Sequence, residues 1–413
     1  MPQVFEGFTV IELADRRNQF IGKLLADSGA RVIQVEPPAG SPGRWIGPFV
    51  EDKEDPDRCL DYWYYNTSKE SASIDITRKP GADLVRRMLT TADIFVESTT
   101  PGTLREHGLD YETISALNPG ILYTSITDFG QDGPWAMYEM NDHAHLALGG
   151  PMGSSGYSDP HETPIGGQRN HAYNMSNVLT MHTITGALFE RMTSGLGQMI
   201  DIAIHDIVGV STESAVPNWL WYNAPYLRQT GQHAAPTYRP TTQVLCGDGN
   251  YIQVSTPGLT THAWVQLVNW MKEVGVAEEL ADEKYNDDFY RQTQLRHSNE
   301  IHAGIHRLLA KVPAHEAFLR GQSLGLAWAA VHAPEDNLEY EHYKQRGYWA
   351  EVDHEEIGRT ILYPRGLYSN NELGSVPKRR APHLGEHTRD ILAGDLGLET
   401  AEIDALVKTE VVR

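Results

Sequence analysis

Short runs of β-branched residues alternate with helical patterns along the first half of the chain. The runs at 8–13 and 31–36 flank a segment at 18–28 whose apolar residues recur at helical spacing, and Gly29 ends that predicted helix. Two strands joined by one helix over about 30 residues form a βαβ unit. The pattern therefore predicts two parallel strands with a right-handed crossover.

The same alternation continues to residue 204. It predicts further helices at 79–91, 111–117 and 174–193 and further strands at 93–97, 121–126 and 199–204. Repeated alternation of strand and helix is typical of a doubly wound α/β sheet. We therefore expect a large Rossmann-like α/β domain, with residues 1–204 as its first part.

The second half of the chain is less regular. Residues 205–240 are rich in Trp, Tyr, Pro and Asn without a clean period, which indicates a linker. Residues 241–335 carry a short strand pair around the turn at 247–250 and then several amphipathic helices, which predicts a smaller α+β domain. The tail, 336–413, is expected to be extended and rich in loops before a last short helix at 399–408.

The charge balance excludes several classes of partner. The 413 residues include 34 Lys+Arg and 55 Asp+Glu, which gives a formal net charge of −21. Such an acidic chain is a poor candidate for binding nucleic acid or an anionic membrane. The N-terminal residues resemble no signal peptide, and no apolar run approaches the ~20 residues that span a bilayer. We therefore expect a cytoplasmic protein without nucleic-acid or membrane partners.

The sequence offers little support for metal or nucleotide cofactors. Cys59 and Cys246 are the two cysteines, and the 18 histidines form no His-Glu-x-x-His pair, so neither a disulfide framework nor a metal site is expected. The loop after the first predicted strand, 14–19, contains no glycine. A dinucleotide or Walker-type phosphate cradle needs glycines there, so NAD, FAD and ATP are disfavoured.

Seven motifs, in order along almost the whole chain, resemble those of family III CoA-transferases, which include formyl-CoA transferase, carnitine CoA-transferase and α-methylacyl-CoA racemase. They lie at 25–38, 40–44, 66–69, 92–97 with 101–102, 129–135, 193–201 and 381–388. The resemblance implies that 336–413 returns to complete the large domain. It also implies two chains interlocked like links, which form an obligate dimer.

The family's chemistry needs an aspartate that this chain lacks. In the family, this carboxylate attacks the acyl-CoA thioester just before the long helix, about 25 residues ahead of the glutamine that corresponds to Gln198. The matching position here is Tyr173, with Asn170, His171 and Asn174 as neighbours. A phenol or an amide cannot carry the acyl anhydride, so we expect no catalytic residue in this chain.

The racemase variant of the family also lacks its machinery here. Its general-base histidine corresponds to Asn141, directly before Asp142. Asp142 matches a common family residue, which we interpret as a helix cap or a hydrogen-bonding turn residue.

The CoA-binding cations of the family are partly replaced. Glu106 and Glu139 occupy positions where relatives carry basic residues, and a carboxylate there repels a polyanion. Arg44 and Lys69 remain, and Arg105 adjoins Glu106, so these three are the weak candidates for CoA binding.

Two hypotheses follow from the resemblance. In the first, this chain is the non-catalytic subunit of a heterodimer or heterotetramer whose paralogous partner supplies the aspartate. The complex would move CoA from an acyl-CoA such as succinyl-CoA to a carboxylic acid, possibly benzylsuccinate in anaerobic aromatic degradation. It would use the CoA thioester as a substrate and bind no cofactor tightly. In the second, a homodimer acts on a CoA thioester through His171 or Tyr173. A binding or regulatory relative without activity is a third reading.

Overall fold

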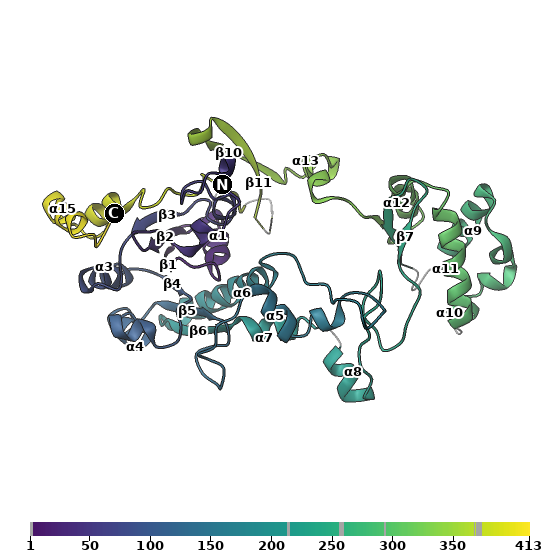
Figure 1. Cartoon of the computed structure of the whole chain (residues 1–413), viewed down its shortest axis with the longest axis horizontal. Coiled ribbons are helices and arrows are strands. Elements are labelled where there is room, and N and C mark those ends of the chain that lie inside the picture. The colour runs from purple at the N-terminus through teal and green to yellow at the C-terminus, as the bar shows by residue number, and fades with distance from the viewer. Residues whose placement is uncertain (1–2, 213–214, 256–259, 293–294, 367, 369–373) are drawn as a thin grey trace. The chain divides into compact units, whose positions relative to one another are not determined.

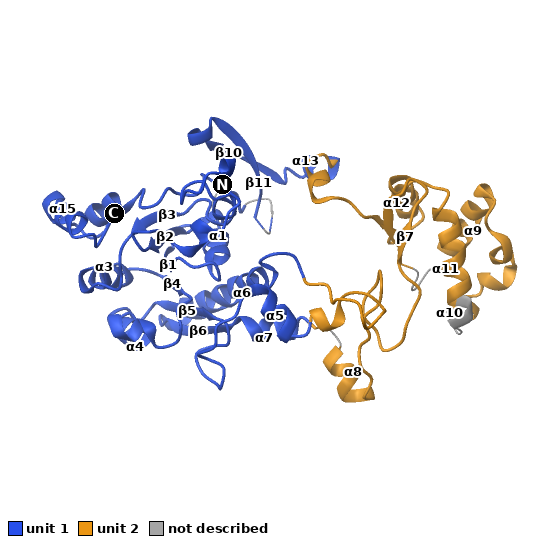
Figure 2. Ribbon diagram, viewed as in Figure 1, with its two compact units in different colours: residues 1–150, 167–211, 341–413 blue, residues 151–166, 212–340 orange. Residues whose placement is uncertain are grey.

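The computed structural model describes residues 3–212, 215–255, 260–292, 295–366, 368 and 374–413. The chain forms two compact units (Figure 2). Unit 1 contains residues 1–150, 167–211 and 341–413, and unit 2 contains residues 151–166 and 212–340. Both ends of the chain therefore contribute to unit 1.

Unit 1 is built on a six-stranded sheet with the order β3-β2-β1-β4-β5-β6 (Figure 1). The strands are β1 (Thr9–Leu13), β2 (Arg31–Glu36), β3 (Glu70–Ser73), β4 (Ile94–Glu97), β5 (Leu122–Thr127) and β6 (Gln198–Ala203). All five neighbouring pairs are parallel. The predicted α/β fold class is confirmed, and the strand order reverses between β1 and β4.

Helices cover both faces of this sheet. The helices of unit 1 are α1 (Gln19–Asp27), α2 (Leu60–Tyr65), α3 (Lys79–Leu89), α4 (Tyr111–Leu117), α5 (Asp142–Leu148), α6 (His171–Ser194), α7 (Ile204–Val210), α13 (Glu341–Gln345), α14 (Thr388–Gly394) and α15 (Thr400–Lys408), and α13 lies away from the sheet (Figure 1). One apolar core joins β1, β2 and β4 to α3, α4, α14 and α15, while α1 and α6 lie on the other side (Figure 1).

The tail is more regular than its composition predicts. An antiparallel hairpin, β10 (Trp349–His354) and β11 (Arg359–Pro364), precedes helix α14. Burial alternates along β10, because the side chains of Ala350, Val352 and His354 point inward. The expectation of an extended, loop-rich tail is therefore wrong for these segments.

Unit 2 has a core of its own. Its strands β7 (Gln243–Leu245), β8 (Tyr251–Gln253) and β9 (Ala329–Ala330) form an antiparallel sheet. Its helices are α8 (Ala215–Tyr222), α9 (Thr261–Val274), α10 (Asp288–Gln292), α11 (Leu295–Leu309) and α12 (Ala314–Ser323). Trp264, Trp270 and Trp328 are fully buried within it. The predicted strand pair and amphipathic helices are confirmed.

Candidate functional site

The expected catalytic position lies where the sheet's strand order reverses. In open α/β sheets, ligands bind beyond the carboxyl ends of the strands at this point. Here the loop after β1 meets the start of α6, since the side chain of Arg16 donates from Nη2 to Asn170 Oδ1 at 3.2 Å. Asn177 Nδ2 also donates to the Arg17 carbonyl at 2.6 Å. The site is therefore formed by segments far apart in sequence.

Tyr173, in the first turn of α6, occupies the position expected for the aspartate. Its side chain is only 6% exposed. Burial, with a smaller contribution from the charge of Asp128, raises the pKa of Tyr173 to about 12. The phenol therefore stays protonated near neutral pH and can act there as a hydrogen-bond donor rather than a nucleophile.

A carboxylate does lie next to this position, although it comes from another helix. Asp142, at the start of α5, accepts a hydrogen bond at Oδ1 from the Tyr173 backbone N–H at 3.2 Å. Asp142 is buried, with 7% of the residue exposed, and Oδ2 accepts no hydrogen bond from the described residues. The cap of α5 is the preceding Asn141, whose Oδ1 accepts from the Ala144 N–H at 2.9 Å. Sequence spacing missed this contact because 31 residues separate its members.

Asp128, after β5, is the centre of a second network beside Tyr173. Its carboxylate accepts from the Met140 N–H at 3.0 Å and from Arg17 Nη1 at 3.3 Å, and it lies 3.0 Å from His145 Nε2. Arg17 Nε also donates to Asp15 at 2.9 Å. Asp128 and His145 are both buried, so this network is a fixed part of the site's wall.

The other residues near the expected position have separate environments. Asn170 is buried, and its φ of 61° places it in the left-handed region before α6. His171 is exposed at the first residue of the helix. Asn174 Nδ2 donates to the Tyr65 hydroxyl at 3.1 Å. The structure thus gathers Asn170 and Tyr173 at the site and leaves the His171 side chain exposed.

Arg44 and Lys69 lie inside unit 1, each in an ion pair. Arg44 contacts Glu36 through two nitrogens, at 2.6 and 2.8 Å, and the Lys69 ammonium lies 2.7 Å from Glu12. All four side chains have 0% exposure. As placed here, neither cation is accessible to a phosphate.

The two buried ion pairs differ in their electrostatics. Burial raises the pKa of Glu12 to about 7 even though Lys69 opposes the shift, and burial lowers the pKa of Lys69. Burial also penalises the Glu36 carboxylate, but Arg44 and the Ser71 hydroxyl outweigh it, so the pKa of Glu36 falls below its usual value. Glu36 is therefore a stably ionised partner, whereas Glu12 takes up a proton close to neutral pH.

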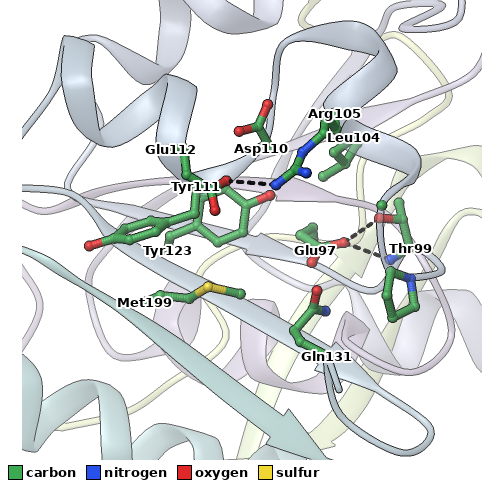
Figure 3. Close-up of a pocket in the computed structure, with 12 residues that line it drawn as sticks. Glu97, Thr99, Leu104, Arg105, Asp110, Tyr111, Glu112, Tyr123, Gln131 and Met199 are labelled. Carbon is green, nitrogen blue, oxygen red and sulfur yellow. Dashed lines mark hydrogen bonds and ion pairs between the residues drawn. The ribbon is translucent and has the colours of Figure 1, made fainter. Parts of the chain in front are cut away.

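Arg105 differs from these two cations because it is 71% exposed. It lines a cavity of about 220 Å³ between the segment after β4 and the sheet. Figure 3 shows Glu97 and Gln131 toward one end of this cavity and the ring of Tyr123 toward the other. Among the described residues, Arg105 pairs with the exposed Glu112 at 3.5 Å, and its guanidinium is accessible to a ligand.

Glu97 is the buried carboxylate of this cavity. Its Oε2 accepts from both the N–H and the hydroxyl of Thr99 at 2.6 Å (Figure 3). Burial raises the pKa of Glu97, against the effect of these hydrogen bonds. The cavity is thus polar at one end and aromatic at the other.

The described residues offer no metal centre and no membrane span. Within these ranges, no group of three or more His, Cys, Asp or Glu side chains could hold a metal ion. The described helices are also too short or too polar to cross a bilayer.

Comparisons with known proteins agree with the motifs. Residues 5–388 match the family described as CoA-transferase family III. The chain is 31% identical to the succinyl-CoA:(R)-benzylsuccinate CoA-transferase subunit BbsE of Thauera aromatica, over 99% of this chain and 98% of the relative. It is 29% identical to the succinate–glutarate CoA-transferase of Agrobacterium fabrum, over 96% of each chain.

Solved structures agree as well. The crystal structure of a CAIB/BAIF family protein from Brucella suis is similar, with a TM-score of 0.80 and 25% identity over 95% of this chain and 99% of that one. The family predicted from the seven motifs is therefore confirmed: this chain belongs to CoA-transferase family III.

Proposed function

We propose that this chain is the non-catalytic subunit of a heteromeric family III CoA-transferase. A paralogous subunit would supply the aspartate, and the complex would move CoA from an acyl-CoA such as succinyl-CoA to a carboxylic acid. The observation that carries this proposal is Tyr173, a buried phenol at the position expected for the nucleophile.

The chemistry of CoA transfer explains why a phenol cannot substitute. A carboxylate attacks the thioester carbonyl, the CoA thiolate leaves, and a mixed anhydride forms. The thiolate then attacks the carbonyl carbon of the enzyme's own aspartyl group and releases the first acid. The acceptor carboxylate then attacks the aspartyl–CoA thioester and expels the CoA thiolate, which gives a second mixed anhydride. The thiolate finally attacks the acyl carbon of the acceptor, which forms the product thioester and frees the aspartate. A tyrosine has no carbonyl carbon for CoA to attack, so Tyr173 could form an ester but no enzyme–CoA thioester.

Relatives support a partnership. The protein from Thauera aromatica is named as a subunit of its CoA-transferase. Another relative, 25% identical over 95% of this chain, is the beta subunit of a succinyl-CoA–L-malate CoA-transferase from Chloroflexus aurantiacus. Both names contain succinyl-CoA, which supports succinyl-CoA as the donor here and leaves benzylsuccinate as a candidate acceptor.

Exposed apolar side chains on each of the two units support a partner chain too. Along α6, Leu179, Phe189 and Met192 are exposed, the last two by 75% and 84%. In unit 2, Leu220 and Trp221 of α8 are exposed by 75% and 82%. Large apolar side chains gathered on a helix in this way are typical of protein–protein contacts. Interlocking with a paralogous chain would bury them.

The candidate CoA-binding residues take different roles in this proposal. Arg44 and Lys69 stabilise unit 1 through Glu36 and Glu12. Arg105 remains free to contact a polyanion at the cavity edge. We therefore expect the partner to bind most of the CoA molecule, with Arg105 as a minor contributor.

One observation favours the homodimeric alternative. Asp142 places a carboxylate beside Tyr173 with one buried oxygen that accepts no hydrogen bond from the described residues. In that alternative, a thioester enzyme would use this cluster with His171 or Tyr173 as a base. The pKa of about 12 for Tyr173 and the exposure of His171 make this the weaker proposal.

Co-expression with an aspartate-containing paralogue tests the proposal. The two chains should co-purify, and intact-mass spectrometry after incubation with succinyl-CoA should detect a covalent adduct on the partner alone. Replacing the partner's aspartate with asparagine is the matched control and should abolish turnover. Full CoA exchange by this chain alone, or an adduct on it, would contradict the proposal.

A further inference from the structure

A buried carboxylate without a counter-cation lines the cavity beside β4. Glu97 is 3% exposed and forms no ion pair with any described residue. The charge of Arg17 acts on it from beyond ion-pair distance, and Arg17 is itself paired with Asp15 and Asp128, at 2.9 and 3.3 Å. A buried charge is normally paired, so the isolation of Glu97 needs an explanation.

The hydrogen bonds of Glu97 are of the kind that favours its ionised form. The Thr99 N–H and hydroxyl both donate to Oε2, at 2.6 Å, and donors to a carboxylate oxygen stabilise its negative charge. Burial acts in the opposite direction and raises the pKa. A cation beside Glu97 would remove this conflict.

The cavity has room for such a cation. Its volume of about 220 Å³ is several times the ~30 Å³ that one water molecule occupies in the liquid. It is smaller than the ~300–1,000 Å³ of sites that hold drug-sized ligands. The cavity therefore fits a ligand of only a few non-hydrogen atoms.

The other polar groups of the cavity also favour a positive charge. Gln131 Nε2 donates to Ser125 Oγ at 2.7 Å, which leaves the Gln131 carbonyl oxygen as an acceptor on the cavity wall. Asp110 and Glu112 add carboxylates. Arg105 is the one cation among the described lining residues; it is 71% exposed at the rim and paired with Glu112. The interior is therefore acidic.

Aromatic and apolar side chains complete the cavity. The rings of Tyr111 and Tyr123 lie 5.8 Å apart, centroid to centroid, at an interplanar angle of 75° (Figure 3). The face of such a ring attracts a cation within ~6 Å. Leu104 and Met199 offer apolar surface for an alkyl chain.

We infer that this cavity binds a small primary alkylammonium ion, with its charged end at Glu97 and beside the Tyr111 ring. The ammonium group has three donors and no acceptor, which matches a wall of acceptors. The inference goes beyond the proposed function, because CoA transfer moves a polyanion and requires no cation.

Titration of the full-length chain with n-butylammonium chloride at constant ionic strength tests this inference. Saturation-transfer difference NMR should detect saturable binding of butylammonium, whereas neutral butan-1-ol, of similar size, should bind at least tenfold more weakly. Glu97→Gln keeps acceptors for Thr99 but removes the charge, so it should weaken butylammonium binding about tenfold or more. Tyr111→Leu should weaken it about threefold by removing the ring. Glu316→Gln is the matched control, since Glu316 is exposed on α12, and it should leave the affinity unchanged.

Three results would overturn the inference. They are no saturable binding of butylammonium, equal affinity for butan-1-ol, and unchanged affinity in both Glu97→Gln and Tyr111→Leu. The comparison of the two ligands uses the unaltered chain, so it decides the question even where a variant fails to fold.

Discussion

Returning a carboxylate to the expected catalytic position is the most informative perturbation of this chain. Tyr173→Asp would place a third acidic group beside Asp142 and Asp128, because Asp142 already lies 3.2 Å from the residue 173 backbone nitrogen. Tyr173→Asn creates the same loss of packing without the charge. The difference between the two variants therefore isolates the electrostatic cost of the carboxylate.

The magnitude follows from Coulomb's law. Two unit charges at ~6 Å repel by about 2–3 kcal/mol at an effective dielectric constant of ~20. Burial of the new carboxylate adds to this repulsion, and the charges of Arg16 and Arg17 oppose it. We therefore expect Tyr173→Asp to be less stable than Tyr173→Asn by about 2–3 kcal/mol at pH 8. That cost raises the folded-state pKa of the new aspartate by about 2 units, from ~3.9 to ~6. The repulsion is then fully present above pH ~6 and disappears as the pH falls below ~4.

Urea unfolding of both variants between pH 4 and 8 measures this difference. Equal stability of the two variants at pH 8 would refute the placement of Asp142 and Asp128 beside residue 173. The same Tyr173→Asp protein should form no adduct with succinyl-CoA, because Glu106 and Glu139 lie at positions where the family resemblance leads us to expect CoA-binding cations. An adduct forming as fast as on an active paralogue would refute that second step.

Four further changes test other parts of the structure. The raised pKa of Glu12, about 7, predicts a pH-dependent free energy of unfolding. About 3 kcal/mol of this free energy is present below pH ~4.5 and is lost as the pH rises through ~7. Unfolding of the Glu12→Gln variant, measured over the same pH range, should not show this loss. Lys69→Met should lower the free energy of unfolding at pH 8 by about 3–5 kcal/mol, because it leaves Glu12 unpaired. The double variant Glu12→Gln with Lys69→Met should recover most of this lost free energy. Replacing Phe189 and Met192 with serine should leave the unfolding midpoint almost unchanged but abolish co-purification with the partner; retained co-purification would contradict the proposed contact. Arg105→Glu should raise the KM of the complex for acyl-CoA about threefold without changing kcat, whereas an unchanged KM would exclude Arg105 from CoA binding.

The sequence predicted the central sheet well because its strands are apolar runs. Strand β3 escaped prediction because Glu70–Ser73 contains only small or charged residues, and its position is set by pairing with β2. The hairpin at 349–364 did carry a usable signal, the alternating burial of Ala350, Val352 and His354.

The site was less predictable than the fold, because residues that are far apart in the sequence meet there. Spacing along the chain could place Tyr173 at the catalytic position, but it could not bring Asp142 to its backbone nitrogen. The burial of Arg44 and Lys69 in ion pairs could have been predicted from the sequences of the strands. Glu12 and Glu36 interrupt two apolar runs, and a buried carboxylate needs a cation beside it.

The C-terminal residues also determine when unit 1 can fold. Ile391, Leu392, Ile403 and Val412 pack in the same core as β1 and β2, and Ile74 forms a β-bridge with Val412. The face of the sheet that α3 and α4 cover therefore stays incompletely covered until the last residues have left the ribosome. Unit 2, with all of its core residues between 244 and 328, can bury its tryptophans earlier in synthesis. That delay would give a newly made chain time to meet the proposed partner before the large unit closes around its own ends.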